Sequence, residues 1–342
     1  MKRFLEKVLA RQNLSQAEAA EAFDLIMSGE ATPAQIAGLI IALRMKGEAV
    51  DEIAGGASSM RRHAVFIDAC GHDVVDTCGT GGDTLGTFNI STTAAFVVAG
   101  AGVPVAKHGN RAVSSSAGSA DVLEALGVDI SLSAADMARC IDECGVGFLF
   151  AQSLHASMRH AGPTRKEIGI RTVFNILGPL TNPAGAKRQL LGVYDARLAP
   201  VLAEVAGRLG AERTLVVNGH PGMDEVSASG PTTVAEYDAA RGSVRTFTIT
   251  PEEVGIARSA LADIAGGDAT ANAGLVRAVL EGEHGARRDV VLMNAAAALV
   301  AAGAASDLAE GVVRARESID SSRAAEVLER LVLTSQRLAK EA

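Results

Sequence analysis

The sequence predicts an α/β fold in two parts: a small all-helical domain and a larger α/β domain with a mainly parallel central sheet. Residues 1–66 carry helix signals only, whereas from Val74 onward short apolar runs alternate with helix-like segments. Such alternation is typical of a parallel sheet covered by helices. The length of 342 residues and the hydrophobic content of 48% suit one large or two moderate domains with a sizeable core.

Charge and aromatic content argue against a nucleic-acid partner. The formal net charge is −8, and aromatic residues make up 3% of the chain, with no Trp. A protein that binds nucleic acid needs a basic face, and one that binds single strands needs aromatic side chains on which bases stack. We therefore expect no nucleic-acid partner.

The apolar runs predict buried elements and not membrane segments. The runs at residues 94–106 and 290–305 are too short to span a bilayer, and the basic N-terminus is not followed by the apolar stretch of a signal peptide. The cysteines at positions 70, 78, 140 and 144 form no Cys-x-x-Cys pair and no cluster with histidine. We expect no membrane partner and a reduced, cytoplasmic location.

Helix-start signals divide the first part of the chain into short helices. The segment 15–18, Ser-Gln-Ala-Glu, is a capping box before an apolar stripe. The segment 32–35, Thr-Pro-Ala-Gln, places an N-cap and an N1 proline before a second stripe. Gly29 and Gly47 stand where helices end. The apolar faces of these helices need a partner, so a small helical subdomain is expected.

Short apolar runs bounded by Gly, Asn or Asp predict the strands of the second part. Parallel strands are expected at residues 74–75, 103–105, 146–150, 190–193 and 215–217. Helices are expected at residues 91–100, 119–126, 134–144 and 200–209. The runs 232–237 and 244–249 alternate more strictly and predict an antiparallel addition, and residues 322–338 predict an amphipathic closing helix.

A glycine-rich segment, residues 76–83, follows the first predicted strand. Ligands of open α/β sheets bind where strands end, and glycines let the backbone close on an anion. The segment is not a dinucleotide fingerprint, because position 84 is Thr, and no Lys-Ser/Thr pair of a P-loop follows. A phosphate cradle is the functional interpretation, and a tight turn without ligand is the alternative.

The polar run at residues 87–93 leads into the helix predicted at 91–100. Ser91 or Thr92 is expected to cap this helix, whose N-terminus favours a phosphate. Capping explains one hydroxyl but not Asn89, Ser91, Thr92 and Thr93 together. The run therefore adds to the predicted phosphate site.

A second candidate cradle, residues 107–116, follows the strand predicted at 103–105. Lys107 and Arg111 can supply charge-assisted hydrogen bonds, and the serines at 114–116 add donors. A solvated basic turn is the alternative. Two cradles joined by one helix predict a substrate with two phosphate ends.

Adjacent carboxylates form a candidate metal site. Asp224 and Glu225 lie in a turn-rich segment after the strand predicted at 215–217. Such a pair can chelate Mg²⁺, which completes its coordination with waters and substrate phosphates. A solvated turn is the usual alternative, but two nearby phosphate cradles favour the metal.

Either of two arginines, Arg165 and Arg171, could grip a carboxylate with both arms of its guanidinium. Their spacing does not say which one, and a surface salt bridge is the default alternative. The histidines at 63, 72, 155, 160, 220 and 284 show no metal spacing.

Five motifs occur in order along the chain. They are Asp-x-x-Gly-Thr-Gly-Gly-Asp at 76–83, Asn-x-Ser-Thr at 89–92, Lys-His-Gly-Asn-Arg at 107–111, Arg-Thr-x-Phe-Asn-x-Leu-Gly-Pro-Leu-x-Asn-Pro at 171–183 and Gly-x-Asp-Glu at 222–225. With them the chain resembles the anthranilate phosphoribosyltransferase family, which has the nucleoside-phosphorylase-like phosphoribosyltransferase fold. The resemblance runs from the N-terminal helices to near the C-terminus.

The resemblance implies a division of the chain. A helical domain would comprise residues 1–69, with a segment near 164–185 that folds back onto it. The α/β domain, which binds phosphoribosyl pyrophosphate (PRPP), would comprise residues 70–163 and 186–342. The resemblance also implies a homodimer formed through the helical domains.

The implied reaction moves the phosphoribosyl group of PRPP to the amine of anthranilate, giving N-(5-phosphoribosyl)anthranilate and pyrophosphate, in tryptophan biosynthesis. Mg²⁺, up to two ions per subunit, is the implied cofactor. An aromatic amine is neutral at pH 7, so we assign no residue as an acid–base catalyst. A pyrimidine nucleoside phosphorylase-like enzyme and a non-catalytic nucleic-acid-binding paralogue are the alternatives.

The site residues implied by the resemblance follow by matching position. The PRPP contacts would be Gly79, Gly82, Asp83, Thr87, Asn89, Ile90, Ser91, Thr92, Lys107, His108, Gly109, Asn110, Arg111, Ala112, Val113, Ser114, Ser115 and Ser119. The anthranilate contacts would be Gly79, Asn110 and Arg165. The Mg²⁺ ligands would be Ser91, Asp224 and Glu225.

Overall fold

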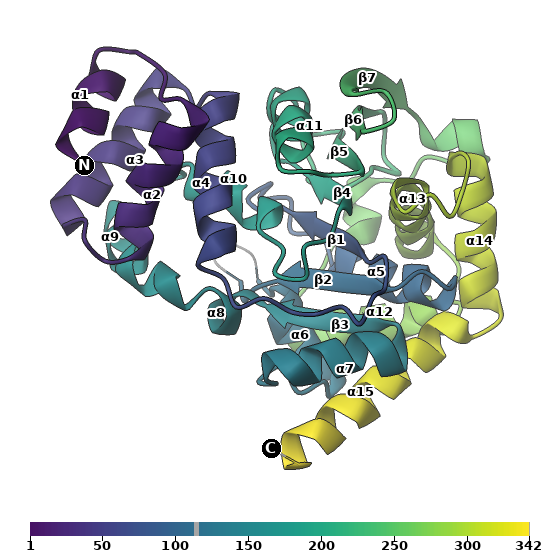
Figure 1. Ribbon diagram of the computed structural model, residues 1–342. Coiled ribbons are helices and arrows are strands. Elements are labelled where there is room, and N and C mark those ends of the chain that lie inside the picture. The colour runs from purple at the N-terminus through teal and green to yellow at the C-terminus, as the bar shows by residue number, and fades with distance from the viewer. Residues whose placement is uncertain (113–115, 342) are drawn as a thin grey trace.

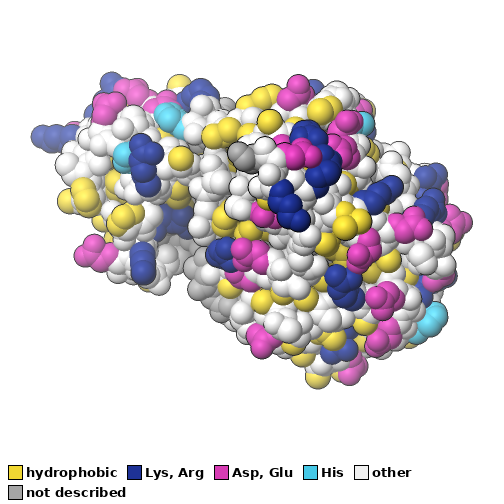
Figure 2. Space-filling model, turned by 90° about the horizontal axis from the view of Figure 1, so that it is seen from below, with side chains coloured by type: hydrophobic (Ala, Val, Ile, Leu, Met, Phe, Trp, Pro, Cys, Tyr) yellow, Lys and Arg dark blue, Asp and Glu magenta, His cyan; other side chains and the backbone are white. Residues whose placement is uncertain are grey.

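The protein folds into two lobes, as Figure 1 shows. The structure is a computed structural model that describes residues 1–112 and 116–341. The N-terminal helices form the helical lobe, and a sheet with its covering helices forms the α/β lobe. Figure 2 shows a hollow between the lobes, on a face where basic side chains are interspersed with acidic ones. Among the described residues, no helix is both long enough and apolar enough to cross a membrane.

The helical lobe contains the helices predicted from their start signals. They are α1 (Lys2–Leu9), α2 (Gln16–Met27), α3 (Pro33–Lys46) and α4 (Val50–Arg62). The Ser15 hydroxyl accepts from the Glu18 N–H, and the Glu18 carboxylate accepts from the Ser15 N–H at 2.8 Å. Thr32 and Gln35 form the same reciprocal pair before α3. The capping box at Ser15 and the N-cap at Thr32 were predicted correctly, because each depends on four neighbouring residues.

A segment from the middle of the chain packs on the helical lobe. It contains α9 (Gly162–Ile168) and α10 (Phe174–Leu177), together with 3-10 turns at Ala156–His160 and Gly178–Leu180, and it is preceded by α8 (Ala151–Leu154), which packs against β3. The Phe174 ring meets the Phe23 ring of α2 edge-on, with centroids 5.6 Å apart. Leu177 is fully buried in the same apolar cluster as α2 and α3. The two lobes are therefore joined by packing as well as by the chain.

The sheet is mainly parallel, as predicted. Its strands are β1 (Val75–Gly79), β2 (Val105–Gly109), β3 (Val146–Phe150), β4 (Arg188–Gly192), β5 (Arg213–Gly219), β6 (Thr232–Asp238) and β7 (Ser243–Ile249). They lie in the order β3-β2-β1-β4-β5-β6-β7. The first five strands in this order are parallel, whereas β6 and β7 add antiparallel pairings at one edge. The carboxyl ends of β1, β2 and β4 therefore meet at one edge of the sheet.

Helices cover both faces of this sheet. The longer ones are α5 (Ile90–Gly100), α6 (Ser119–Leu126), α7 (Ala134–Cys144), α11 (Leu198–Arg208), α12 (Ala269–Leu280), α13 (Ala286–Ala301), α14 (Leu308–Asp320) and α15 (Arg323–Glu341). Neighbouring residues of β4 show the two faces, since Leu190 packs with α5 and α13 while Leu191 packs with α11. This alternation is the ordinary geometry of a strand.

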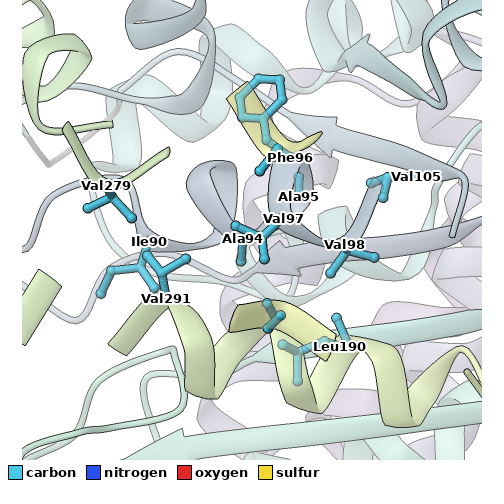
Figure 3. Close-up of a cluster of buried hydrophobic side chains, with 14 of the residues drawn as sticks. Ile90, Ala94, Ala95, Phe96, Val97, Val98, Val105, Leu190, Val279 and Val291 are labelled. Atoms are coloured by element: carbon cyan, nitrogen blue, oxygen red, sulfur yellow. The ribbon is translucent and has the colours of Figure 1, made fainter. Parts of the chain in front are cut away.

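Helix α5 lies in the centre of the α/β lobe. Figure 3 shows its side chains among Val105, Leu190, Val279 and Val291, which come from two strands and two other helices. A helix that is apolar on all sides belongs in a core. Its burial fixes the position of its N-terminus, which opens toward the carboxyl ends of the strands.

Two strands extend beyond their predicted ends. The apolar runs at 74–75 and 103–105 mark only the starts of β1 and β2, which continue to Gly79 and Gly109. Lys107 and His108, expected in a loop, therefore lie inside β2, each with 4% of its surface exposed. Polar residues are tolerated there because each has hydrogen-bond partners, described below.

Candidate functional site

The glycine segment leaves the sheet at the end of β1 and is held there by its backbone. The Thr80 N–H donates to the Gly192 carbonyl at 2.9 Å, and the Gly81 N–H donates to Asp224 Oδ2 at 2.6 Å. A Cβ on Gly79 would come within 2.5 Å of that same oxygen. Glycine at 79 is therefore required by the close approach of the Asp224 carboxylate.

The N-terminus of α5 meets the second carboxylate. The helix begins at Ile90 and its N-cap is Asn89, whose side chain makes no capping hydrogen bond. The prediction that Ser91 or Thr92 caps the helix was therefore wrong. The Ser91 N–H, in the first turn, donates to Glu225 Oε1 at 3.0 Å. A carboxylate from a distant loop thus takes the place of a local cap.

Asp224 and Glu225 form a half-buried acidic pair. Burial raises the pKa of Asp224, and the charge of Asp83 raises it further. Burial also raises the pKa of Glu225, with a further contribution from Asp224, while Lys107 opposes the shift. Carboxylates held together in this way favour a cation between them. The pair is therefore not the solvated turn that was the alternative.

Lys107 supports the site from inside the sheet. Its Nζ donates to the Thr77 carbonyl at 2.5 Å and to Ser91 Oγ at 3.3 Å. It thus connects β1, β2 and the first turn of α5, and its charge partly balances Glu225. The prediction of a cation on a loop was wrong, because β2 runs past position 107.

Arg111 is already paired in the structure. Its guanidinium forms ion pairs with Asp121 and Glu124 of α6, and these bonds raise its pKa. The Asp121 carboxylate also accepts from the Ala112 N–H at 3.0 Å. Arg111 therefore shapes the turn before α6, and its role as a PRPP contact stays a prediction. Three expected contacts, Val113, Ser114 and Ser115, lie outside the described residues.

His108 belongs to a buried pair of imidazoles. Its Nε2 lies 3.2 Å from Nε2 of His155. Burial lowers the pKa of His108 to about 3 and that of His155 to about 4. Both rings are therefore neutral at pH 7, so one donates a hydrogen bond to the other. His108 contributes no positive charge to the site.

Arg165 comes from the segment that packs on the helical lobe, whereas Gly79, another expected anthranilate contact, ends β1 of the α/β lobe. Arg165 is half-buried on α9, with its guanidinium carbon 5.0 Å from the centroid of the Phe174 ring. Burial lowers its pKa. The Arg165 backbone N–H donates to the Ala161 carbonyl at 3.0 Å. Its guanidinium, which faces the Phe174 ring, makes no hydrogen bond or ion pair within the described residues, so the alternative of a bridge to Glu167 is not formed. Likewise no hydrogen bond in the described chain links it to Gly79 or Asn110.

Arg171, the other candidate, lies against the glycine segment. Its Nη2 donates to the Gly82 carbonyl, and its guanidinium carbon lies 4.3 Å from the centroid of the Tyr194 ring. Arg171 is therefore tied to the glycine segment. Of the two candidates, only Arg165 has a guanidinium without a hydrogen-bond partner in the described part of the chain.

Comparison with known proteins assigns the family. Residues 71–325 match the model described as glycosyl transferase family, a/b domain. Residues 2–64 match the helical bundle domain of the glycosyl transferase family. The chain belongs to this glycosyl transferase family. The two matched regions correspond closely to the α/β lobe and to the four helices of the helical lobe.

Relatives within this glycosyl transferase family are similar over their full lengths. A protein from Moorella thermoacetica named anthranilate phosphoribosyltransferase is 59% identical over 332 residues, covering 97% of each chain. One of the same name from Symbiobacterium thermophilum is 55% identical over 341 residues, covering 100% of this chain and 99% of the other. These similarities confirm the family resemblance inferred from the motifs.

Solved structures show the same glycosyl transferase fold. Anthranilate phosphoribosyltransferase from Thermus thermophilus is 45% identical, with a TM-score of 0.92, covering 97% of this chain and 99% of that one. The Saccharomyces cerevisiae enzyme in complex with PRPP and Mg is 30% identical, with a TM-score of 0.88, covering 98% and 97%. The predicted fold, a helical domain with a larger mainly parallel α/β domain, is confirmed.

Two buried polar residues near this site, Asn272 and Asp76, make contacts that were not predicted. Asn272 of α12, which is 2% exposed, donates from Nδ2 to Asn89 Oδ1 at 2.8 Å. Asp76 is fully buried and accepts from the His108 N–H at 3.1 Å and from Gln189 Nε2 at 3.1 Å. Burial raises the pKa of Asp76 to about 6. The available signal was a polar side chain next to apolar or small ones: Asp76 follows two valines, and Asn272 stands between two alanines.

Proposed function

We propose that this chain transfers the phosphoribosyl group of PRPP to the amine of anthranilate, releasing pyrophosphate, as a Mg²⁺-dependent step of tryptophan biosynthesis. The observation that carries the proposal is that the glycine segment and the N-terminus of α5 meet at one acidic pair. Asp224 binds the glycine segment, and Glu225 binds the N-terminus of α5. Relatives of 59% and 55% identity, both named for this reaction, support it.

The chemistry of the acidic pair fits Mg²⁺. Burial and repulsion between neighbouring carboxylates raise the pKa values of both half-buried carboxylates, and Lys107 opposes this shift only at Glu225, so a bound cation would relieve the repulsion. Asp224, Glu225 and the Ser91 hydroxyl would hold the ion. Bound Mg²⁺ would stabilise the negative charge that grows on the leaving pyrophosphate. The yeast structure with PRPP and Mg supports the use of this metal.

The chain's own residues would bind and align the substrates. The N–H groups of the glycine segment and of the first turn of α5 that have no partner in the described chain would donate hydrogen bonds to phosphate oxygens. Arg165, whose fork has no partner in the described chain, would receive the anthranilate carboxylate. Holding the amine against the ribose carbon would supply much of the rate. No protein group needs to remove a proton before attack, because the amine is already neutral.

The test is a substrate panel on the purified protein. We expect anthranilate consumption and pyrophosphate release that require PRPP, anthranilate and Mg²⁺ together. Reactions lacking each component in turn are the controls, and a pyrimidine nucleoside with phosphate tests the alternative reaction. Turnover of the nucleoside, or PRPP consumption independent of anthranilate, would contradict the proposal.

We also propose that the protein is a homodimer and is located in the cytoplasm. We further propose that the chain divides into two domains. The helical domain comprises residues 1–69 and 164–185, and the α/β domain comprises residues 70–163 and 186–342. The division is supported by the packing of α9 and α10 on the helical lobe. Mass measurement in solution by light scattering tests the dimer.

A further inference from the structure

Arg171 occupies a junction between three parts of the molecule. It lies between α9 and α10, in the segment that packs on the helical lobe. Its guanidinium donates to the Gly82 carbonyl of the glycine segment and covers the Tyr194 ring, which follows β4. Arg171 is exposed, and Tyr194 is half-buried. A stacked guanidinium is restricted to one plane, so its hydrogen bond has a fixed direction.

The glycine segment is held by one contact at each of three successive residues. Thr80 is bound to the backbone of β4 and Gly81 to Asp224. The third contact, at Gly82, comes from Arg171. Gly81 and Gly82 have φ values of +67° and +84°, a backbone region that glycine enters at no steric cost and therefore also leaves easily. Each contact therefore limits a segment with little intrinsic rigidity.

The contact from Arg171 differs from the other two in where it originates. Thr80 and Gly81 are held by the α/β lobe itself, whereas Arg171 follows α9, which carries Arg165 and packs against α3. The chain between Arg165 and Arg171 therefore connects the expected anthranilate contact with the expected PRPP loop.

We propose that Arg171 is a positioning residue that fixes the glycine segment for PRPP, with the Tyr194 ring holding its guanidinium in place. This inference rests on the proposed function for the identity of the ligand. Arg171 acts through the Gly82 carbonyl, so its planar, stacked shape matters as well as its charge. A lysine at this position would keep the positive charge but would lose the planar guanidinium that stacks on the Tyr194 ring and offers several N–H donors.

The test compares matched variants in steady-state kinetics. Arg171→Ala is expected to raise the KM for PRPP about tenfold, which corresponds to about 1.4 kcal/mol, and to change the KM for anthranilate less than about threefold. Arg171→Lys should raise the KM for PRPP as much as Arg171→Ala does. Tyr194→Leu should raise this KM by a smaller factor. Tyr194→Phe keeps the aromatic ring and should resemble wild type. Arg197→Ala is the control, since Arg197 is exposed nearby and pairs with Asp195.

A second readout does not depend on catalysis. Hydrogen exchange of the peptide covering residues 79–88, measured without substrate, should be faster in Arg171→Ala and Tyr194→Leu than in wild type and Arg197→Ala. Melting temperatures should stay within a few degrees of wild type, because Arg171 is exposed.

Three outcomes would overturn the inference. Unchanged exchange and an unchanged KM for PRPP would show that Arg171 does not hold the loop. Full rescue by Arg171→Lys with no effect of Tyr194→Leu would show a simple charge effect on the phosphates. A lower melting temperature with both KM values unchanged would show a merely structural arginine. If wild type lacks the transferase activity but the exchange differences appear, the proposed function fails while the holding of the loop stands.

Discussion

Removing the guanidinium of Arg165 separates recognition of anthranilate from recognition of PRPP. Arg165 is half-buried with its pKa lowered, and no described residue accepts a hydrogen bond from its guanidinium. A carboxylate bound there would receive charge-assisted bonds worth about 1.5–3 kcal/mol. Arg165→Ala should therefore lower kcat/KM for anthranilate about ten- to a hundredfold. The KM for PRPP should change little, because Asp224, Glu225 and the glycine segment remain.

The stability of this variant should change little. The interaction lost from the folded state is the contact of the guanidinium with the Phe174 ring, which is worth about 0.5–1 kcal/mol, and removal of a partly buried charge offsets it. Thermal unfolding of the purified variant checks this point.

Steady-state kinetics with each substrate varied in turn is the deciding assay. Arg165→Lys keeps the positive charge but lacks the paired N–H donors of a guanidinium, so it should recover only part of the activity that Arg165→Ala loses. Arg159→Ala is the matched control, because Arg159 is an exposed arginine on the same segment. Wild-type affinity of Arg165→Ala for anthranilate, or an equal loss for both substrates, would refute the assignment of the carboxylate to Arg165.

Three further predictions follow from the contacts at the acidic pair. Lys107→Met removes the donor to the Thr77 carbonyl and to the Ser91 hydroxyl, so it should lower the free energy of unfolding by about 1–3 kcal/mol and weaken PRPP binding more than anthranilate binding. Urea unfolding and the two KM values check this, and equal losses of affinity would point to a structural lysine. Gly79→Ala places a Cβ against the Asp224 carboxylate, which should cost about 1–3 kcal/mol of stability and reduce Mg²⁺-dependent turnover, whereas wild-type turnover would show that the close approach is unimportant. The pKa values of Asp224 and Glu225 are raised, so protons compete with Mg²⁺ near neutral pH. Mg²⁺ affinity should therefore fall as the pH is lowered through these pKa values. Without Mg²⁺, the free energy of unfolding should fall as the pH rises through the same range, because the folded state binds protons more tightly than the unfolded state. Calorimetric Mg²⁺ titrations and melting curves at several pH values test both signs, and pH-independent values would contradict them.

Local patterns predicted the parts of the fold that local interactions determine. The capping box at Ser15 and the N-cap at Thr32 involve neighbouring residues, so the sequence alone was sufficient. The strand ends at Lys107 and His108 were missed because an apolar run was taken as the whole strand. A central parallel strand can continue through polar residues when neighbouring strands satisfy them, as Thr77 does for Lys107.

The contacts across the site could not be predicted from spacing. The bond between Asn89 and Asn272, the bond from Arg171 to Gly82 and the capping of α5 by Glu225 all join residues more than 80 positions apart. A single sequence indicates which residue types can bind phosphate or metal, but their pairing depends on the sheet order. The roles of the expected site residues toward substrates therefore remain predictions.

The most direct test of the central claim is calorimetric titration of PRPP into the wild-type protein and the double variant Asp224→Asn, Glu225→Gln, each with and without Mg²⁺. The two substitutions remove the charges and keep the shapes of both side chains. The claim predicts that Mg²⁺ strengthens PRPP binding to wild type at least about tenfold, and that this gain disappears in the double variant while its melting temperature is retained. An equal gain from Mg²⁺ in both proteins would contradict the claim that this acidic pair forms the metal and pyrophosphate site.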